Sequence, residues 1–299
     1  MKLGVTEAYP QVMYGSEPNI GQLCKYIRWA KEIGVKSVEL TAITEEHLYR
    51  DFTQRNDIDQ LLSCCELCDL EIVAFEAFFC KDMLTNPNEG IMRKLAEHFE
   101  KSVAVTKDMG AKIIYTLSSA PPEWHLTFDT KVYGTAPPTE VRVLPDFSWR
   151  RSWNSYVERI RTLTRIAESE DLNFGLEIRP YEIVSSSNAM LTLIQEVDSD
   201  SFGVIFDTAH FFVQKEILPV AVEKLNGSIL LVHLADNDGC VDSHLPPGKG
   251  KIDWKSFLAA LRKIGYDGSI NLDIHGTPEN ISDEYLYGKH YIEKILNRI

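Results

Sequence analysis

Short apolar runs alternate with amphipathic stretches from one end of the chain to the other. The runs have the length and the content of β-branched residues that are typical of strands buried on both faces. They predict eight strands, at residues 2–7, 37–41, 71–78, 112–117, 173–178, 202–207, 228–234 and 269–274.

The stretches between these runs carry the spacing of one-sided helices. In one helix the apolar positions follow i, i+3, i+4, i+7 and i+10, at Ile20, Leu23, Cys24, Ile27 and Ala30. A second helix with the same spacing follows Asp253, which is placed to cap its first turn, at Trp254, Phe257, Leu258, Leu261 and Ile264. Several helices end in a glycine just before the next strand, as in "KEIG", "DMG" and "RKIG".

Eight strands alternating with eight helices predict a (β/α)8 TIM barrel, formed as a single domain by residues 1–299. An open doubly wound sheet is the alternative fold, but it normally has a glycine-rich phosphate turn after its first strand, and the sequence has none there. The connection at 118–150 is long and rich in proline and aromatic residues. We expect it to cover a bound substrate.

The composition of the chain argues against some classes of binding partner and indicates where the protein is located. The 299 residues have a formal net charge of −13, which opposes binding to nucleic acid or to an anionic membrane surface. The first ten residues lack the apolar core of a signal peptide and no run of eighteen apolar residues occurs, so a cytoplasmic protein is expected. The cysteines of "CCELC", at 64–68, are interpreted as buried thiols on a helix rather than as zinc ligands.

Four potential metal ligands stand at the ends of the last four predicted strands. They are Glu177, Asp207, His233 and Asp273. Each alone could cap a helix, but in a barrel the strand ends meet at one mouth. Three carboxylates there would repel one another unless a cation lay among them. Three oxygen donors and an imidazole suit Mn²⁺, Mg²⁺, Co²⁺ or Zn²⁺.

The motifs around these residues resemble those of the xylose isomerase-like TIM barrel superfamily, which contains sugar isomerases and epimerases. The similarity lies in "LEIRP", "FDTAH", "HLADNDG…HLPPGKGKIDW" and "G-x-I-x-L-D". It implies one divalent metal, with Mn²⁺ favoured, bound by Glu177, Asp207, His233 and Asp273. It also implies that His210 contacts substrate oxygens, and that the chain forms a homo-oligomer or binds a small accessory subunit.

The sequence departs from this family at its last strand, where the ligand is usually Glu and here is Asp273. The shorter side chain can still bind metal but reaches less far toward a substrate C–H bond. His275 faces the same side of the strand, and Arg179 the same side as Glu177. We therefore expect Glu177, Asp273 and His275 as catalytic residues, His275 as a proton carrier, and Arg179 as a substrate ligand beside His210.

The loop after the seventh strand crowds polar residues together, including the D-x-H of Asp242 and His244. DNA-repair members of the superfamily, of the endonuclease IV type, bind further zinc ions with such a motif. They also need histidines at the ends of strands three and four, which here read "AFEAFF" and "YTLSSA". Asp242 and His244 are therefore expected to bind substrate or to order the loop. Trp124 and His125, in the long fourth connection, are further candidates for substrate binding.

Three functions remain open from the sequence. The first is a metal-dependent isomerase or epimerase that moves a proton next to the carbonyl of a ketose, keto-sugar or inosose. The second is a lyase or dehydratase that uses the same chemistry but ends in elimination, as in inosose dehydratases and enzymes that cleave C-glycosides. The third is a sugar-binding barrel without catalysis.

Overall fold

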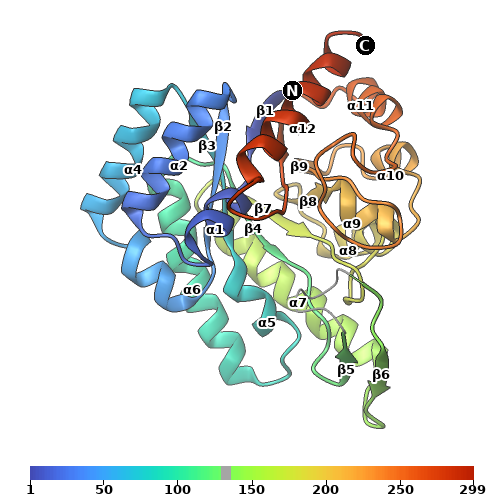
Figure 1. Cartoon of the computed structure of the whole chain (residues 1–299). Coiled ribbons are helices and arrows are strands. Elements are labelled where there is room, and N and C mark those ends of the chain that lie inside the picture. Colours follow the sequence, from blue (N-terminus) through green and yellow to red (C-terminus); the bar gives the residue numbers. More distant parts are fainter. Residues whose placement is uncertain (129–135) are drawn as a thin grey trace.

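The computed structural model describes residues 1–128 and 136–299, which fold into a closed eight-stranded parallel barrel (Figure 1). Each of the eight predicted runs overlaps one barrel strand, and only β2 extends beyond its run, by one residue. Around the barrel the strands follow the order β1-β10-β9-β8-β7-β4-β3-β2. Their bounds are β1 Lys2–Val5, β2 Ser37–Ala42, β3 Glu71–Ala77, β4 Ile113–Leu117, β7 Asn173–Glu177, β8 Phe202–Asp207, β9 Ile229–Leu234 and β10 Ser269–Leu272. The predicted single-domain TIM barrel is confirmed.

Helices follow every barrel strand and cover its outer side. The main ones are α2 Ile20–Ile33, α4 Arg55–Cys68, α6 Glu89–Asp108, α7 Trp149–Glu168, α8 Ser187–Val197, α10 Leu218–Lys224, α11 Trp254–Lys263 and α12 Ile281–Leu296. Shorter elements lie at the strand-to-helix connections: α1 Ala8–Tyr14, α3 Glu45–His47, α5 Lys81–Leu84, α9 Thr208–Val213, the π-helix η1 Leu48–Phe52 and the 3-10 helix η2 Phe78–Cys80.

The predicted glycine end of α2 is present, with Gly34 in the left-handed conformation. At the start of the same helix Asn19 and Gln22 form a capping box, which was not among the predicted caps. Asp253 caps α11 by accepting a hydrogen bond from the Ser256 backbone N–H. The predicted apolar faces of both helices pack into the core, with Ile264 only partly buried.

The α4 cysteines are buried, as predicted. Among the residues that the structure describes, the clusters able to bind a metal contain no cysteine.

The long fourth connection forms an antiparallel hairpin of β5 Trp124–Thr127 and β6 Glu140–Val143. This hairpin extends beyond the barrel, at the lower right of Figure 1. The prediction that 118–150 covers a substrate stays untested, and part of it falls on 129–135, outside the described residues.

Within the two described ranges, none of the helices has the length and apolar content needed to cross a lipid bilayer.

Candidate active site

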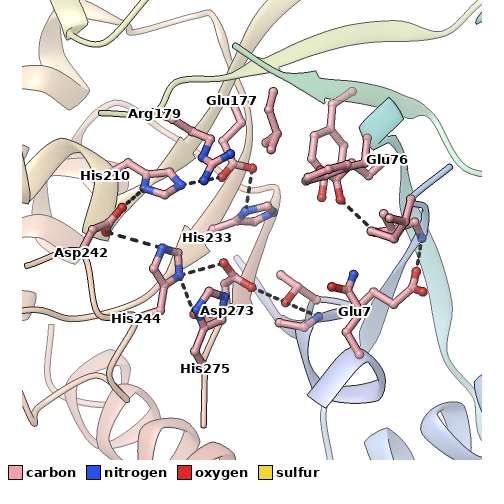
Figure 2. A pocket seen from close by; sticks show the side chains of 18 residues that line it. Glu7, Glu76, Glu177, Arg179, His210, His233, Asp242, His244, Asp273 and His275 are labelled. Atoms are coloured by element: carbon pink, nitrogen blue, oxygen red, sulfur yellow. Dashed lines mark hydrogen bonds and ion pairs between the residues drawn. The ribbon is translucent and has the colours of Figure 1, made fainter. Parts of the chain in front are cut away.

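The carboxyl ends of the barrel strands surround a polar cavity of about 220 Å³. Its polar lining includes eight of the residues that the sequence singled out: Glu177, Arg179, His210, His233, Asp242, His244, Asp273 and His275. It also includes Thr6, Glu7, Gln11, Thr41, Glu76 and Tyr115. Figure 2 shows Glu177, His210 and Asp242 on one side of this space and Glu7 and Glu76 on the other. This is the mouth at which TIM-barrel active sites lie.

Glu177 ends β7 and lies between two histidines. Its Oε1 is 3.1 Å from His210 Nε2, and its Oε2 is 3.3 Å from His233 Nδ1. Burial by itself would raise the pKa of this carboxyl, but the charges and hydrogen bonds of His233 and His210 outweigh burial and lower the pKa to about 2. Glu177 is therefore an ionised carboxylate at neutral pH and able to accept a proton.

His233, on β9, is oriented by the carboxylate of Glu39 on β2. Its Nε2 lies 3.1 Å from Glu39 Oε1, and Glu39 also accepts hydrogen bonds from the Tyr115 hydroxyl and the Asn271 amide. With a proton on Nε2 directed at Glu39, Nδ1 is left as a potential metal-binding atom. Nδ1 has no hydrogen-bond partner among the described residues, despite its proximity to Glu177. A histidine held in this way is typical of metal sites in proteins.

Asp207 ends β8 and caps α9 through its Oδ1, which accepts a hydrogen bond of 2.9 Å from the His210 backbone N–H. Its Oδ2 is buried and has no partner within the described part of the chain. Burial is the largest influence on this carboxyl and raises its pKa to about 6, even though His210 and His244 act in the opposite direction. An unsatisfied buried carboxylate oxygen is costly unless a cation or a ligand completes it.

Three groups of side chains bring potential ligand atoms within 4.8 Å of one another. One contains Glu177, Asp207 and His233; the others are Asp207 with His210 and His244, and His244 with Asp273 and His275. The first group unites three of the four predicted ligands, and two of its members, Asp207 and His233, carry the unpartnered atoms described above. These triads fit a divalent cation in their chemistry. Asp273 falls in a different group, and its role as the fourth ligand stays a prediction.

Asp273 directly follows β10, and both of its carboxylate oxygens have partners. Oδ1 accepts a hydrogen bond of 2.6 Å from the Thr6 hydroxyl, and Oδ2 lies 3.0 Å from His244 Nδ1. Beside it, the rings of His244 and His275 stack with centroids 4.4 Å apart. Desolvation and the neighbouring His244 lower the pKa of His275 to about 4, so His275 is neutral at pH 7. A neutral histidine can accept a proton but not donate one as an acid.

Asp242 connects two histidines of the cavity wall. Its Oδ2 lies 2.7 Å from His210 Nδ1, and its Oδ1 lies 3.5 Å from His244 Nε2. Burial would raise the pKa of Asp242, but His210 and His244 outweigh burial and lower it to about 2. Asp242 is thus a buried anion that fixes the ring of His210, whose other nitrogen faces Glu177.

The crowded loop after β9 divides into a structural part and a cavity part. The Asp236 carboxylate accepts hydrogen bonds from the backbone N–H groups of Asn237, Gly248 and Ile252 and from the Trp254 indole. A Cβ at Gly250 would lie 2.2 Å from Asp236 Oδ1, which explains a glycine in that turn. Asp236 therefore shapes the loop that brings Asp242 and His244 to the cavity.

Trp124 and His125 do not line the cavity. The Trp124 ring packs against Phe147 and Trp149, and His125, on the same hairpin, is exposed. Substrate binding by these two residues stays a prediction.

Sequence reasoning missed the carboxyl groups that come from the first three strands. Glu7 follows β1, Glu39 lies within β2 and Glu76 lies within β3, and all three are buried. A signal was present, because Glu39 and Thr41 alternate with apolar residues in "SVELTA" and Glu76 interrupts the apolar run "IVAFEA". In a barrel strand this alternation marks side chains that point inward.

The model of the xylose isomerase-like TIM barrel family matches residues 27–291. Because this match covers most of the chain, the protein belongs to that family. Fructoselysine 3-epimerase of Shigella flexneri is 22% identical over 273 residues, which are 89% of this chain and 90% of that enzyme. An uncharacterised protein of Methanocaldococcus jannaschii is 26% identical over 166 residues, so this chain spans only about half of that relative, 54% of its length.

Solved structures share the same fold. D-Psicose 3-epimerase from Clostridium cellulolyticum H10, solved with D-tagatose, superposes with a TM-score of 0.76 at 17% identity, covering 99% of both chains. The IOLI protein, solved with a zinc atom, superposes with a TM-score of 0.71 at 19% identity, covering 99% of this chain and 96% of that one. At these identities the superpositions establish the barrel alone, and it is the family model that places the chain among the xylose isomerase-like TIM barrels.

Proposed function

We propose that the protein is a metal-dependent epimerase or isomerase of a keto-sugar. The observation that carries the proposal is the position of Glu177, which is an ionised carboxylate in the cavity wall, between His210 and His233 and beside the buried, unpartnered oxygen of Asp207. A base next to a potential cation site is the arrangement that removal of a proton next to a carbonyl requires. The relatives that act on fructoselysine and D-psicose support a small carbohydrate as the substrate.

Glu177, Asp207 and His233 would hold the divalent cation, with Asp273 as the proposed fourth ligand and Mn²⁺ as the favoured ion. When bound, the cation would supply Lewis-acid stabilisation of the negative charge that develops on the substrate's carbonyl oxygen. The protonated form of His233 is favoured by the nearby Glu39 and Glu177, which outweigh burial and raise its pKa. Since a ligating histidine must be neutral, cation binding should release a proton and weaken as the pH falls.

The protein's own side chains account for the remaining roles. Glu177 removes the proton from the carbon next to the carbonyl, and His210 and Arg179 bind substrate hydroxyls. Asp242 orients His210, and His244 and His275 border the same space. The cavity of about 220 Å³ is smaller than the roughly 300–1,000 Å³ common for drug-sized ligands, which favours a single sugar unit.

The contacts that Asp273 makes favour a second candidate function, a keto-sugar lyase or dehydratase. Both Asp273 oxygens already have partners in Thr6 and His244, so this shortened carboxylate is poorly placed as a second base. Elimination needs one base and one acid for the leaving group, which the cavity could supply without Asp273.

Incubation in deuterated water separates the two candidates. The metal-loaded protein is given D-psicose, D-tagatose and D-fructose in one set of reactions, and an inosose and a 3-keto-glucoside in another. Deuterium entering an otherwise unchanged carbon skeleton, with formation of an isomer, supports the proposed function. Loss of water or release of an aglycone supports the lyase, and binding without either product supports a non-catalytic sugar-binding barrel. The cytoplasmic location and the association with further copies or a small subunit stay predictions.

A further inference from the structure

Epimerisation at one carbon of a substrate that keeps its orientation needs two proton carriers, because the proton leaves from one face of the carbon and another arrives at the opposite face. Glu177 is suited to one of these roles. Asp273 is poorly suited to the other, because it is one methylene shorter than Glu and is held by Thr6 and His244. The question is whether another group of the same cavity can act as the second carrier.

Glu76 has the required position. It lies near the end of β3, a strand separated from β7 by β4 alone in the barrel, and it lines the same cavity as Glu177. In Figure 2 it lies across the cavity from His210 and Asp242. Its residue is 8% exposed, so the carboxyl is screened from bulk water but not sealed from the cavity. Glu76 and Glu177 thus approach a bound ligand from separate walls.

The surroundings of Glu76 favour a neutral carboxylic acid. Its Oε2 accepts a hydrogen bond of 2.9 Å from the Thr41 hydroxyl, an uncharged partner. Burial and then the negative charge of Glu177 raise its pKa to about 8, against the smaller opposing influences of Thr41 and His233. Glu39 also faces it and acts in the same direction as Glu177. At neutral pH Glu76 carries a proton that it can donate.

Glu7 is the other carboxyl on this wall, and its geometry suits it less well. One Glu7 oxygen accepts a hydrogen bond from the Thr41 backbone N–H, and the residue is only 1% exposed. Thr41 therefore links the two carboxyls, with its backbone on Glu7 and its hydroxyl on Glu76. This arrangement fixes Glu76 on the cavity side.

We propose that Glu76 is the second acid–base residue, which delivers a proton to the face of the reacting carbon that Glu177 does not serve. The inference rests on the proposed epimerase function. Glu177 takes the proton as the C–H bond breaks, and the electron pair passes into the enediolate. Glu76 then gives its proton to the same carbon as the new C–H bond forms. Glu177 ends protonated and Glu76 ionised, and proton exchange with water restores both.

The test is Glu76→Gln, which keeps the size of the side chain and its hydrogen bond with Thr41 but cannot donate a carboxylic acid proton. Wild type and variant are incubated with each ketose in deuterated water, and both deuterium incorporation and epimer formation are followed by NMR. We expect the variant to lose epimer formation by at least about 100-fold. It should still exchange the substrate's own proton for deuterium through Glu177, with retained configuration.

Glu71→Gln is the matched control, because Glu71 lies on the same strand but is exposed and pairs with Lys2. Glu76→Asp, measured beside it, should recover part of the epimerisation that the Gln variant loses. Equal losses of exchange and epimerisation in Glu76→Gln, or epimerisation within about threefold of wild type, would overturn the inference alone. A wild-type protein that neither exchanges nor epimerises any ketose would contradict the proposed function and this inference together.

Discussion

The two halves of the cavity shift the pKa values of similar carboxyl groups in opposite directions. On the half formed by β7–β10, Glu177 and Asp242 face histidines at 2.7–3.3 Å, and the pKa of each carboxyl falls to about 2. On the half formed by β1–β3, Glu7 and Glu76 are hydrogen-bonded to the uncharged Thr41, and their pKa values rise. Burial is similar on both sides. The difference lies in whether a cationic partner is present.

This contrast supports the proposed roles of Glu177 as the base and Glu76 as the acid. Groups whose surroundings push their pKa values apart are suited to complementary roles in proton transfer. In the proposed mechanism the half formed by β7–β10 would supply the base and the ligands for a cation, and the half formed by β1–β3 would supply a proton donor. Substitutions that alter the charge on one half should therefore affect different measurable quantities from those that alter the other.

The largest effect is expected for Glu177→Gln. The amide cannot accept the substrate proton, so both deuterium exchange and product formation should fall by at least about 1,000-fold. Glu76→Gln, by contrast, should retain deuterium exchange. The exchange rate therefore distinguishes the role of Glu177 from that of Glu76. Exchange persisting in Glu177→Gln at more than a tenth of the wild-type rate would show that another residue is the base.

Glu39→Gln should weaken cation binding by about 10- to 100-fold, because it removes the negative charge that orients His233 without removing a ligand. Calorimetric titration with Mn²⁺ measures this directly. Exposed Glu71→Gln, at the opposite end of β3 from the cavity, serves as the control and should bind as wild type does. If Glu39→Gln binds Mn²⁺ with unchanged affinity, Glu39 does not support cation binding by orienting His233.

Glu76 should also make the free energy of unfolding depend on pH. In the folded chain Glu76 keeps its proton up to about pH 8, whereas in the unfolded chain it releases the proton near its usual pKa of 4.5. The unfolded chain therefore binds fewer protons between these values, and stability falls as the pH rises. Glu76→Gln should remove this dependence and stabilise the metal-free protein at pH 8 by on the order of 1–3 kcal/mol.

Urea unfolding of the wild type and Glu76→Gln at pH 5 and pH 8 measures that difference. Glu182 is buried and its pKa is also raised, to about 7, chiefly by burial, so the comparison must be made between the two proteins rather than within one. The quantity compared is the difference in the free energy of unfolding between Glu76→Gln and the wild type. If this difference is no larger at pH 8 than at pH 5, Glu76 is ionised in the folded chain.

The smallest effect on catalysis is expected for a substitution in the hairpin of β5 and β6. His125 is exposed and borders a separate depression with Glu140 and Arg142, so His125→Ala should change KM by no more than about threefold. Steady-state kinetics with the preferred ketose decide this. A larger rise in KM would show that the hairpin closes over the substrate, as its composition suggests.

The barrel could be predicted from the sequence because its strands are continuous apolar runs and its helices carry one-sided spacing and capping residues. Glu177, Asp207 and His233 could be predicted because each stands at or next to the end of a strand, where a barrel gathers its chemistry. Glu39 lies inside β2, and Glu76, although next to the end of β3, stands in an apolar run. Whether such side chains meet in the centre depends on the register between strands far apart in the chain. The engagement of Asp273 with Thr6 depends on contacts between the first and last strands, which no local pattern encodes.

All the roles proposed for the cavity depend on Glu177, Asp207 and His233 binding one divalent cation. The most direct test is metal analysis of the purified protein after reconstitution with excess Mn²⁺ and removal of loosely bound ion. We predict about one equivalent for the wild type and less than about a tenth of an equivalent for a protein carrying both Asp207→Asn and His233→Ala, whose folding is checked by circular dichroism. A wild type with less than a tenth of an equivalent, or a double variant that retains a full one, would contradict the claim.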